Sequence, residues 1–117
     1  MGLHHAVCHV IGGLTRFPHG INNAIVLPHA VRANAALAPG AVAAVAEAFG
    51  ISDLAAEAEA IAAGFSLPTS FAELGAPPDL VERALPRVME QALLRNNPVV
   101  PDEATVRELL QRAYGAR

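Results

Sequence analysis

The chain has 117 residues, of which 53% are hydrophobic and 16% are charged, a composition that supports one folded domain and excludes a disordered tail. Eight Arg and no Lys stand against eleven acids, so the formal net charge is -3 and no basic stripe is present to follow a phosphate backbone. We therefore expect no nucleic-acid partner. The single Cys8 excludes an intramolecular disulfide and a CxxC site, and it favours a reducing, cytoplasmic setting.

Charge is distributed unevenly along the chain. Residues 1–46 contain two Arg, all five His and no acid, whereas all eleven Asp and Glu lie from Glu47 onward. A segment this poor in charge is normally buried, and a domain of this size has limited capacity to bury it alone. The asymmetry therefore predicts a missing partner surface. The apolar runs near the N-terminus are shorter than the roughly 20 residues of a membrane span, so no membrane partner is expected.

Apolar residues recur at helical spacing along the sequence, and no segment shows the alternation of a strand. The expected helices cover residues 2–11, 21–34, 39–49, 52–61, 77–96 and 102–113, with a short turn before Gly75. The Gly12–Gly13 pair is predicted to end the first helix, and Pro28 to kink the second. Ser52 is predicted to cap the fourth helix, and Asp102 suits the positive end of the last. The pattern predicts one all-α domain over residues 1–117, a bundle-like array of six or seven helices.

The histidines carry the clearest chemistry. His5 and His9 are four residues apart, so they share one face of a helix. His19 follows the Gly12–Gly13 turn, where a returning loop would bring a third imidazole to the same place. Neutral imidazole suits Zn(II), Fe(II) or Ni(II), and three such ligands with an open position would polarise a carbonyl or alcohol oxygen. The alternative from the residues alone is a set of hydrogen-bonded core histidines without a metal.

A metal at these histidines would need a negative ligand from elsewhere. A divalent ion of this kind is usually balanced by a carboxylate or a thiolate. None of the first 46 residues is acidic, and Cys8 points about 100° away from His9 on a helix. We therefore expect the missing ligand to come from a separate domain or chain.

Turn glycines, Pro-His dipeptides and histidines follow one another in a particular order along three stretches of the sequence. The stretches are Gly2–Gly13, Phe17–Gly20 and Asn22–His29, followed by Asn34. This order resembles the C-terminal domain of the iron-containing alcohol dehydrogenases. The Leu-His-His and Cys-His-Val-Ile-Gly-Gly details are most similar to the maleylacetate reductase branch of that family. The similarity continues to the final helix and covers nearly the whole chain.

The resemblance implies roles for individual residues. His5 and His19 would coordinate a divalent metal, iron or zinc, together with an Asp and a His supplied from elsewhere. His9 would lie by the substrate as a catalytic proton donor or relay, and the alternative is a ring that only orients His5. Arg16 and Arg32 would help to hold a dicarboxylate substrate through charge-assisted hydrogen bonds, and the alternative is that both are merely exposed. His29 would support helix packing.

The resemblance also implies an NAD(P)H-dependent oxidoreductase of aromatic catabolism that reduces maleylacetate to 3-oxoadipate. No glycine-rich phosphate loop follows a strand in this sequence, so the cofactor needs a separate N-terminal α/β domain or subunit as partner. Two alternatives remain. One is a non-catalytic helical module that forms a homo-oligomer through its apolar N-terminal face. The other is a small stand-alone enzyme that uses its His cluster for acid–base chemistry.

Overall fold

The computed structural model describes residues 2–64 and 68–115, apart from the side chains of residues 62, 63, 92 and 93. Within these ranges the chain is helical and contains no strand, which confirms the all-α prediction. The α-helices are α1 (Gly2–Thr15), α2 (His19–Leu37), α3 (Pro39–Ala48), α4 (Leu54–Gly64), α5 (Leu80–Met89) and α6 (Glu103–Tyr114). Two short 3₁₀ helices, η1 (Ala72–Leu74) and η2 (Ala92–Asn96), flank α5. No helix in the described part is both long enough and apolar enough to cross a membrane.

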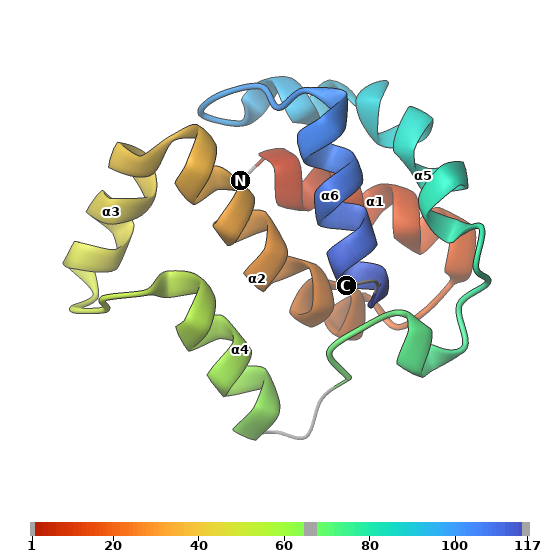
Figure 1. Cartoon of the computed structure of the whole chain (residues 1–117), viewed down its shortest axis with the longest axis horizontal. Coiled ribbons are helices and arrows are strands. Elements are labelled where there is room, and N and C mark those ends of the chain that lie inside the picture. Colours follow the sequence, from red (N-terminus) through yellow and green to blue (C-terminus); the bar gives the residue numbers. More distant parts are fainter. Residues whose placement is uncertain (1, 65–67, 116–117) are drawn as a thin grey trace.

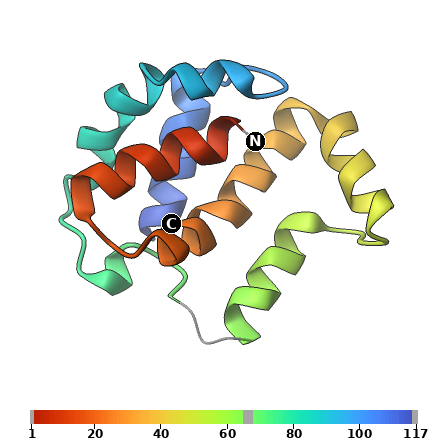
Figure 2. The ribbon, with the colours of Figure 1, turned by 180° about the vertical axis from the view of Figure 1, so that it is seen from behind.

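The core lies between α1, α2, α5 and α6, whose apolar faces meet in one cluster of buried side chains. In Figure 1, α6 crosses in front of α1, and the reverse view in Figure 2 places α1 in front. Phe71, just before η1, and Leu94 of η2 complete the cluster. The helices α3 and α4 lie to one side, contribute no residue to this cluster, and are held chiefly through their packing on α2.

The predicted end of the first helix at Gly12–Gly13 is wrong, because α1 continues to Thr15. The amide of Arg16 still donates to the carbonyl of Gly12 at 3.1 Å, so helical bonding passes through both glycines. Arg16 itself adopts the left-handed conformation, with φ of 60°, and this non-glycine residue ends the helix. Such a conformation costs about 1 kcal/mol, so packing of α1 in the core outweighs the local preference of the glycines.

Three other predicted boundaries also differ from the structure. The second helix reaches Leu37 rather than Asn34, because the Asn34 carbonyl still accepts the amide of Ala38 at 2.7 Å. The first turn of α4 is capped by Asp53, whose Oδ1 accepts the amide of Ala56 at 3.0 Å, and not by Ser52. The expected long helix over residues 77–96 is divided into α5 and η2, because Gln91 between them has an extended backbone.

A buried pair of asparagines, Asn34 and Asn97, ties three segments of the fold together. The Nδ2 of Asn97 donates to Oδ1 of Asn34 at 2.6 Å and to the carbonyl of Val99 at 2.8 Å. Its Oδ1 accepts the backbone amide of Leu3, at the start of α1, at 3.0 Å. Because the first amides of a helix lack partners within it, this bond fixes where α1 begins.

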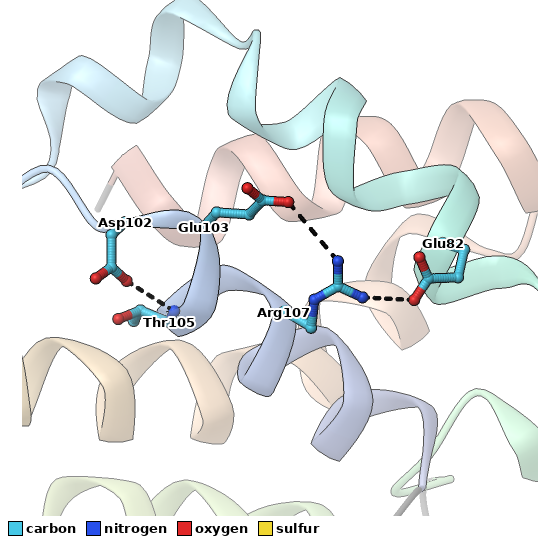
Figure 3. Close-up of polar contacts among 5 residues, drawn as sticks. All are labelled: Glu82, Asp102, Glu103, Thr105 and Arg107. Carbon is cyan, nitrogen blue, oxygen red and sulfur yellow. Dashed lines mark hydrogen bonds and ion pairs between the residues drawn. The ribbon is translucent and has the colours of Figure 1, made fainter.

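The last helix, α6, begins as the sequence predicts. Asp102 caps it, with Oδ1 accepting the amide of Thr105 at 2.8 Å, as Figure 3 shows. The hydrogen bonds from Thr105 hold the pKa of Asp102 below its ordinary value. One turn further, Arg107 forms ion pairs with Glu103 of its own helix and with Glu82 of α5, so α5 and α6 are joined at their exposed edge (Figure 3).

Candidate functional site

A pocket of about 530 Å³ lies where α1 packs beside the start of α2. It is lined by His4, His5, Cys8, His9, Gly12, Gly13, His19 and Asn23. The pocket therefore gathers four of the five histidines of the chain. It contains no carboxylate among its lining residues, which agrees with the absence of acids from this part of the sequence.

The turn between α1 and α2 positions the third predicted histidine. Thr15 Oγ1 donates to the carbonyl of Ile11 at 2.8 Å and accepts the amide of Phe17 at 3.3 Å, so the chain reverses tightly after α1. The ring of Phe17 stacks on Phe71, with centroids 6.2 Å apart, and anchors this turn to the core. As a result His19 stands at the first position of α2 and lines the same pocket as the histidines of α1.

The structure brings His5, His9 and His19 to one pocket, as their spacing predicts, and all three side chains are exposed there. Arg16 also lies in the turn before His19, but it is not among the lining residues. Its exposed side chain makes no ion pair with the part of the chain that the structure describes. The predicted roles of these four residues remain predictions.

His4 and Cys8 are pocket residues that were not predicted. Burial raises the pKa of Cys8 to about 12, so its sulfur is a neutral thiol rather than a metal-binding thiolate. His4 Nε2 lies 3.5 Å from Cys8 Sγ and 3.4 Å from the carbonyl oxygen of Asn23. Burial lowers the pKa of His4, with the hydrogen bond to Asn23 opposing this effect, so the ring is neutral. The signal in the sequence was the four-residue spacing of His4 and Cys8, the same as that of His5 and His9.

Asn22 lies fully buried behind the pocket, between α1 and α2. Neither atom of its side-chain amide has a hydrogen-bond partner among the described residues. A Cβ added at Gly12 would lie 3.7 Å from Asn22 Nδ2, which is an ordinary van der Waals distance, so the packing of α1 on α2 at this point does not require a glycine. Cys8 Sγ lies 3.9 Å from the Asn22 carbonyl oxygen, to which its thiol donates.

The metal-ligating side chains of the pocket could form only part of a metal site. Two exposed imidazoles, His5 and His19, are ligands that Fe(II) and Zn(II) accept. Within residues 2–64 and 68–115, however, no three His, Cys, Asp or Glu side chains converge in a way that could hold a metal ion. A metal bound here would therefore need further ligands from outside the described residues.

His29 and Arg32 lie further along α2, away from the pocket. Arg32 pairs with Glu59 of α4 at 2.9 Å. His29 is half-buried, and burial is the main cause that lowers its pKa, with a smaller contribution from Arg32. Its Nδ1 has no hydrogen-bond partner among the described residues. Arg32 therefore lies outside the pocket, in contrast to its predicted substrate role, while the half-buried ring of His29 packs within the fold.

Comparison with known proteins supports the family resemblance over nearly the whole chain. The model of the Fe-containing alcohol dehydrogenase family, C-terminal, matches residues 1–114. Maleylacetate reductase from Burkholderia cepacia is 35% identical over 114 residues, which are 97% of this chain and 32% of the relative. NAD-dependent methanol dehydrogenase from Bacillus methanolicus is 30% identical over 122 residues, covering 95% of this chain and 31% of the relative. The crystal structure of maleylacetate reductase from Agrobacterium tumefaciens matches with a TM-score of 0.81 and 32% identity, covering 98% of this chain and 32% of that chain.

The helical fold with its histidine-lined pocket is thus that of the helical domain of an oxidoreductase family. The chain belongs to the Fe-containing alcohol dehydrogenase family and corresponds to its C-terminal domain. Several of its relatives are maleylacetate reductases, which confirms the branch that the Leu-His-His stretch indicates. The chain spans about a third of the length of these relatives.

Proposed function

We propose that this chain is a single helical domain, residues 1–117, that forms the metal- and substrate-binding part of a maleylacetate reductase-like enzyme. The observation that carries the proposal is that His5, His9 and His19 line one pocket in a chain matched by the family model over residues 1–114. A partner α/β domain or subunit would hold NAD(P)H at this pocket. The reaction is the reduction of maleylacetate to 3-oxoadipate in aromatic catabolism.

The reaction adds a hydride and a proton across a carbon–carbon double bond that is conjugated to a ketone. When bound, the nicotinamide cofactor supplies the hydride and a divalent metal supplies positive charge for the ketone oxygen. His5 and His19 would hold that metal through their imidazole nitrogens, together with an Asp and a His of the partner. The partner's carboxylate explains how a site with no acid of its own is balanced in charge.

His9 supplies the proton. It is exposed to the pocket and lies one helical turn from His5, so it would stand in the same pocket as the metal that His5 would help to hold. Arg16, in the turn before His19, reaches one of the two substrate carboxylates by a charge-assisted hydrogen bond. Its lack of an ion pair within the described part of the chain leaves the guanidinium available for this role.

A complementation assay tests the proposal. The chain is mixed with the segment of the Burkholderia cepacia maleylacetate reductase that lies outside the matched region, and NADH oxidation is followed with and without maleylacetate. We expect maleylacetate-dependent oxidation, lowered about 10²–10⁴-fold in the His9→Ala variant if His9 is the proton donor. The His5→Ala and His19→Ala variants should lower the metal content of the complex.

The His29→Gln variant is the matched control, because His29 lies outside the pocket and its replacement should leave turnover close to that of the wild type. A complex that forms and binds NADH, but oxidises it no faster with maleylacetate, contradicts the proposed function.

A further inference from the structure

Exposed aliphatic side chains gather around one groove on the far part of α2. The large hydrophobic residues exposed in the described part of the chain are Leu27, Val45, Phe49, Ile61, Val99 and Val100. Leu27, Val45 and Ile61 line a groove of about 490 Å³. The two valines directly follow Pro98, which also lines it. A contiguous apolar surface of this kind marks a site of interaction rather than ordinary exposure.

The shape of the groove suits the binding of a helix. Its floor is α2 and its walls are α3 and α4, which both pack on α2 but scarcely on each other. Along the floor, Ala24, Leu27 and Val31 recur at intervals of three and four residues, so they form one stripe along the helix. The walls leave Leu27 exposed and Ala24 partly exposed, whereas Val31 is buried. An amphipathic helix lying in the groove would cover the stripe through residues at the same spacing.

The charge of the groove restricts what can occupy it. Glu57 is the only charged residue among the described residues that line it. Its neighbour Glu59 is paired with Arg32, but Glu57 makes no ion pair within the described part of the chain. Covering an unpaired carboxylate with an apolar surface carries a large desolvation cost. The occupant must therefore place a Lys or Arg against Glu57.

The groove and the histidine-lined pocket both lie along α2. His19 and Asn23 line the pocket, and the next residue, Ala24, which points about 100° around the helix from Asn23, lines the groove. A polypeptide that contacts both the pocket and the groove would therefore wrap part of the way around α2. This chain spans 32% of the length of the Burkholderia cepacia reductase, so a complete enzyme of this kind has ample further chain to do so.

We infer that an amphipathic helix of the partner domain or subunit that completes the enzyme docks in this groove, with its apolar face on α2 and a cationic side chain against Glu57. The inference rests on the proposed function for the identity of the partner. It adds a second contact, distinct from the pocket, through which the partner recognises this domain.

Adjacent residues of α3 allow a matched test. The probe is the same complementary segment of the Burkholderia cepacia reductase, shown to be folded by its binding of NADH. Val45 lines the groove and Ala44 beside it does not, while both are exposed. We expect Val45→Glu to weaken association by about tenfold or more, because it buries a charge in the interface, and Ala44→Glu to change it by less than about twofold. Glu57→Lys should weaken association more than Glu57→Gln.

Circular dichroism of each variant alone checks that it is folded, and hydrogen exchange of the wild-type complex should show new protection in α3 and α4. Equal binding by the Val45→Glu and Ala44→Glu variants would overturn the docking inference, as would failure of the NADH-binding segment to associate with the wild-type chain. If association depends on Val45 but no maleylacetate-dependent turnover appears, the docking inference stands and the proposed reaction fails.

Discussion

The five histidines have different surroundings, and these surroundings separate their roles. His5, His9 and His19 are exposed in the pocket, where they are available to a metal or a substrate. His4 and His29 are half-buried, and burial lowers the pKa of both, because a charged imidazolium loses its hydration there. The half-buried pair therefore contributes to the packing of α1 and α2 as neutral rings.

The surroundings of His29 make folding stability depend on pH. Its pKa is lowered in the folded state, mainly by burial and further by Arg32 and Arg112, against an opposing effect of Glu59. Below the ordinary value of 6.5 the unfolded chain binds a proton that the folded chain does not. The contribution of His29 to stability is thus fully present above pH 6.5 and is lost as the pH falls through the folded-state pKa.

We expect the free energy of unfolding, measured by urea denaturation, to fall below pH 6.5, and to fall less steeply in the His29→Gln variant. Part of the pH dependence of the unfolding free energy that remains in the variant comes from His4, whose pKa is also lowered in the folded state. An unchanged slope in His29→Gln would show that this ring is not neutral in the folded domain.

At the scale of elements, α1 is held at its start by a side chain from outside the helix and at its end by its own Thr15. Asn97 binds the amide of Leu3 at its start, and Thr15 binds the carbonyl of Ile11 at its end. Between these ends α1 carries His5 and His9, so the anchors fix the position of the pocket wall. The bond from Asn97 comes from a loop 94 residues further along the chain.

Loss of this anchor should destabilise the domain. Asn97→Ala removes the acceptor of the buried Leu3 amide and the donor to Asn34, which predicts a loss of about 1–3 kcal/mol in the free energy of unfolding. The neighbouring Asn96 is exposed and makes no side-chain hydrogen bond to the described residues, so Asn96→Ala is the matched control. Urea denaturation of the two variants measures the difference. Equal midpoints would contradict the anchoring role of Asn97.

The elements show which structural features local sequence can predict. Helical spacing of apolar residues predicts the helices themselves, and Asp102 correctly marks the start of α6, because both signals act within one or two turns. The Gly12–Gly13 pair misleads, since packing of α1 against α2 outweighs a local tendency to end the helix. The bond between Asn97 and Leu3 joins residues too distant in sequence for any local pattern to reveal it.

The same distinction applies to the site at the scale of the whole molecule. The spacing of His5 and His9 predicts their shared face, and the turn at Thr15 brings His19 beside them. The absence of acids from residues 1–46 indicates that a charged ligand must come from elsewhere. The groove between α3 and α4 was not predictable, because Ala-rich helices show little contrast between their faces and only the packing of these helices on α2 reveals the groove.

The placement of α3 and α4 outside the main core has a measurable consequence. Both helices pack chiefly on α2, and neither contributes to the buried cluster between α1, α2, α5 and α6. Regions with few buried apolar contacts open at a lower free energy than the core. We therefore expect backbone amides of α3 and α4 to exchange hydrogen faster than those of α1, α5 and α6 in the isolated chain.

Native-state hydrogen exchange read by mass spectrometry measures this difference peptide by peptide. If the partner docks between α3 and α4, its addition should slow exchange there more than in α5, because the two helices then have apolar contacts on a second side. Uniform protection of all six α-helices in the isolated chain would instead show that the domain opens as a single cooperative unit. In that case the groove would be as rigid before docking as after it, and only binding experiments with the Val45→Glu variant would report on the partner.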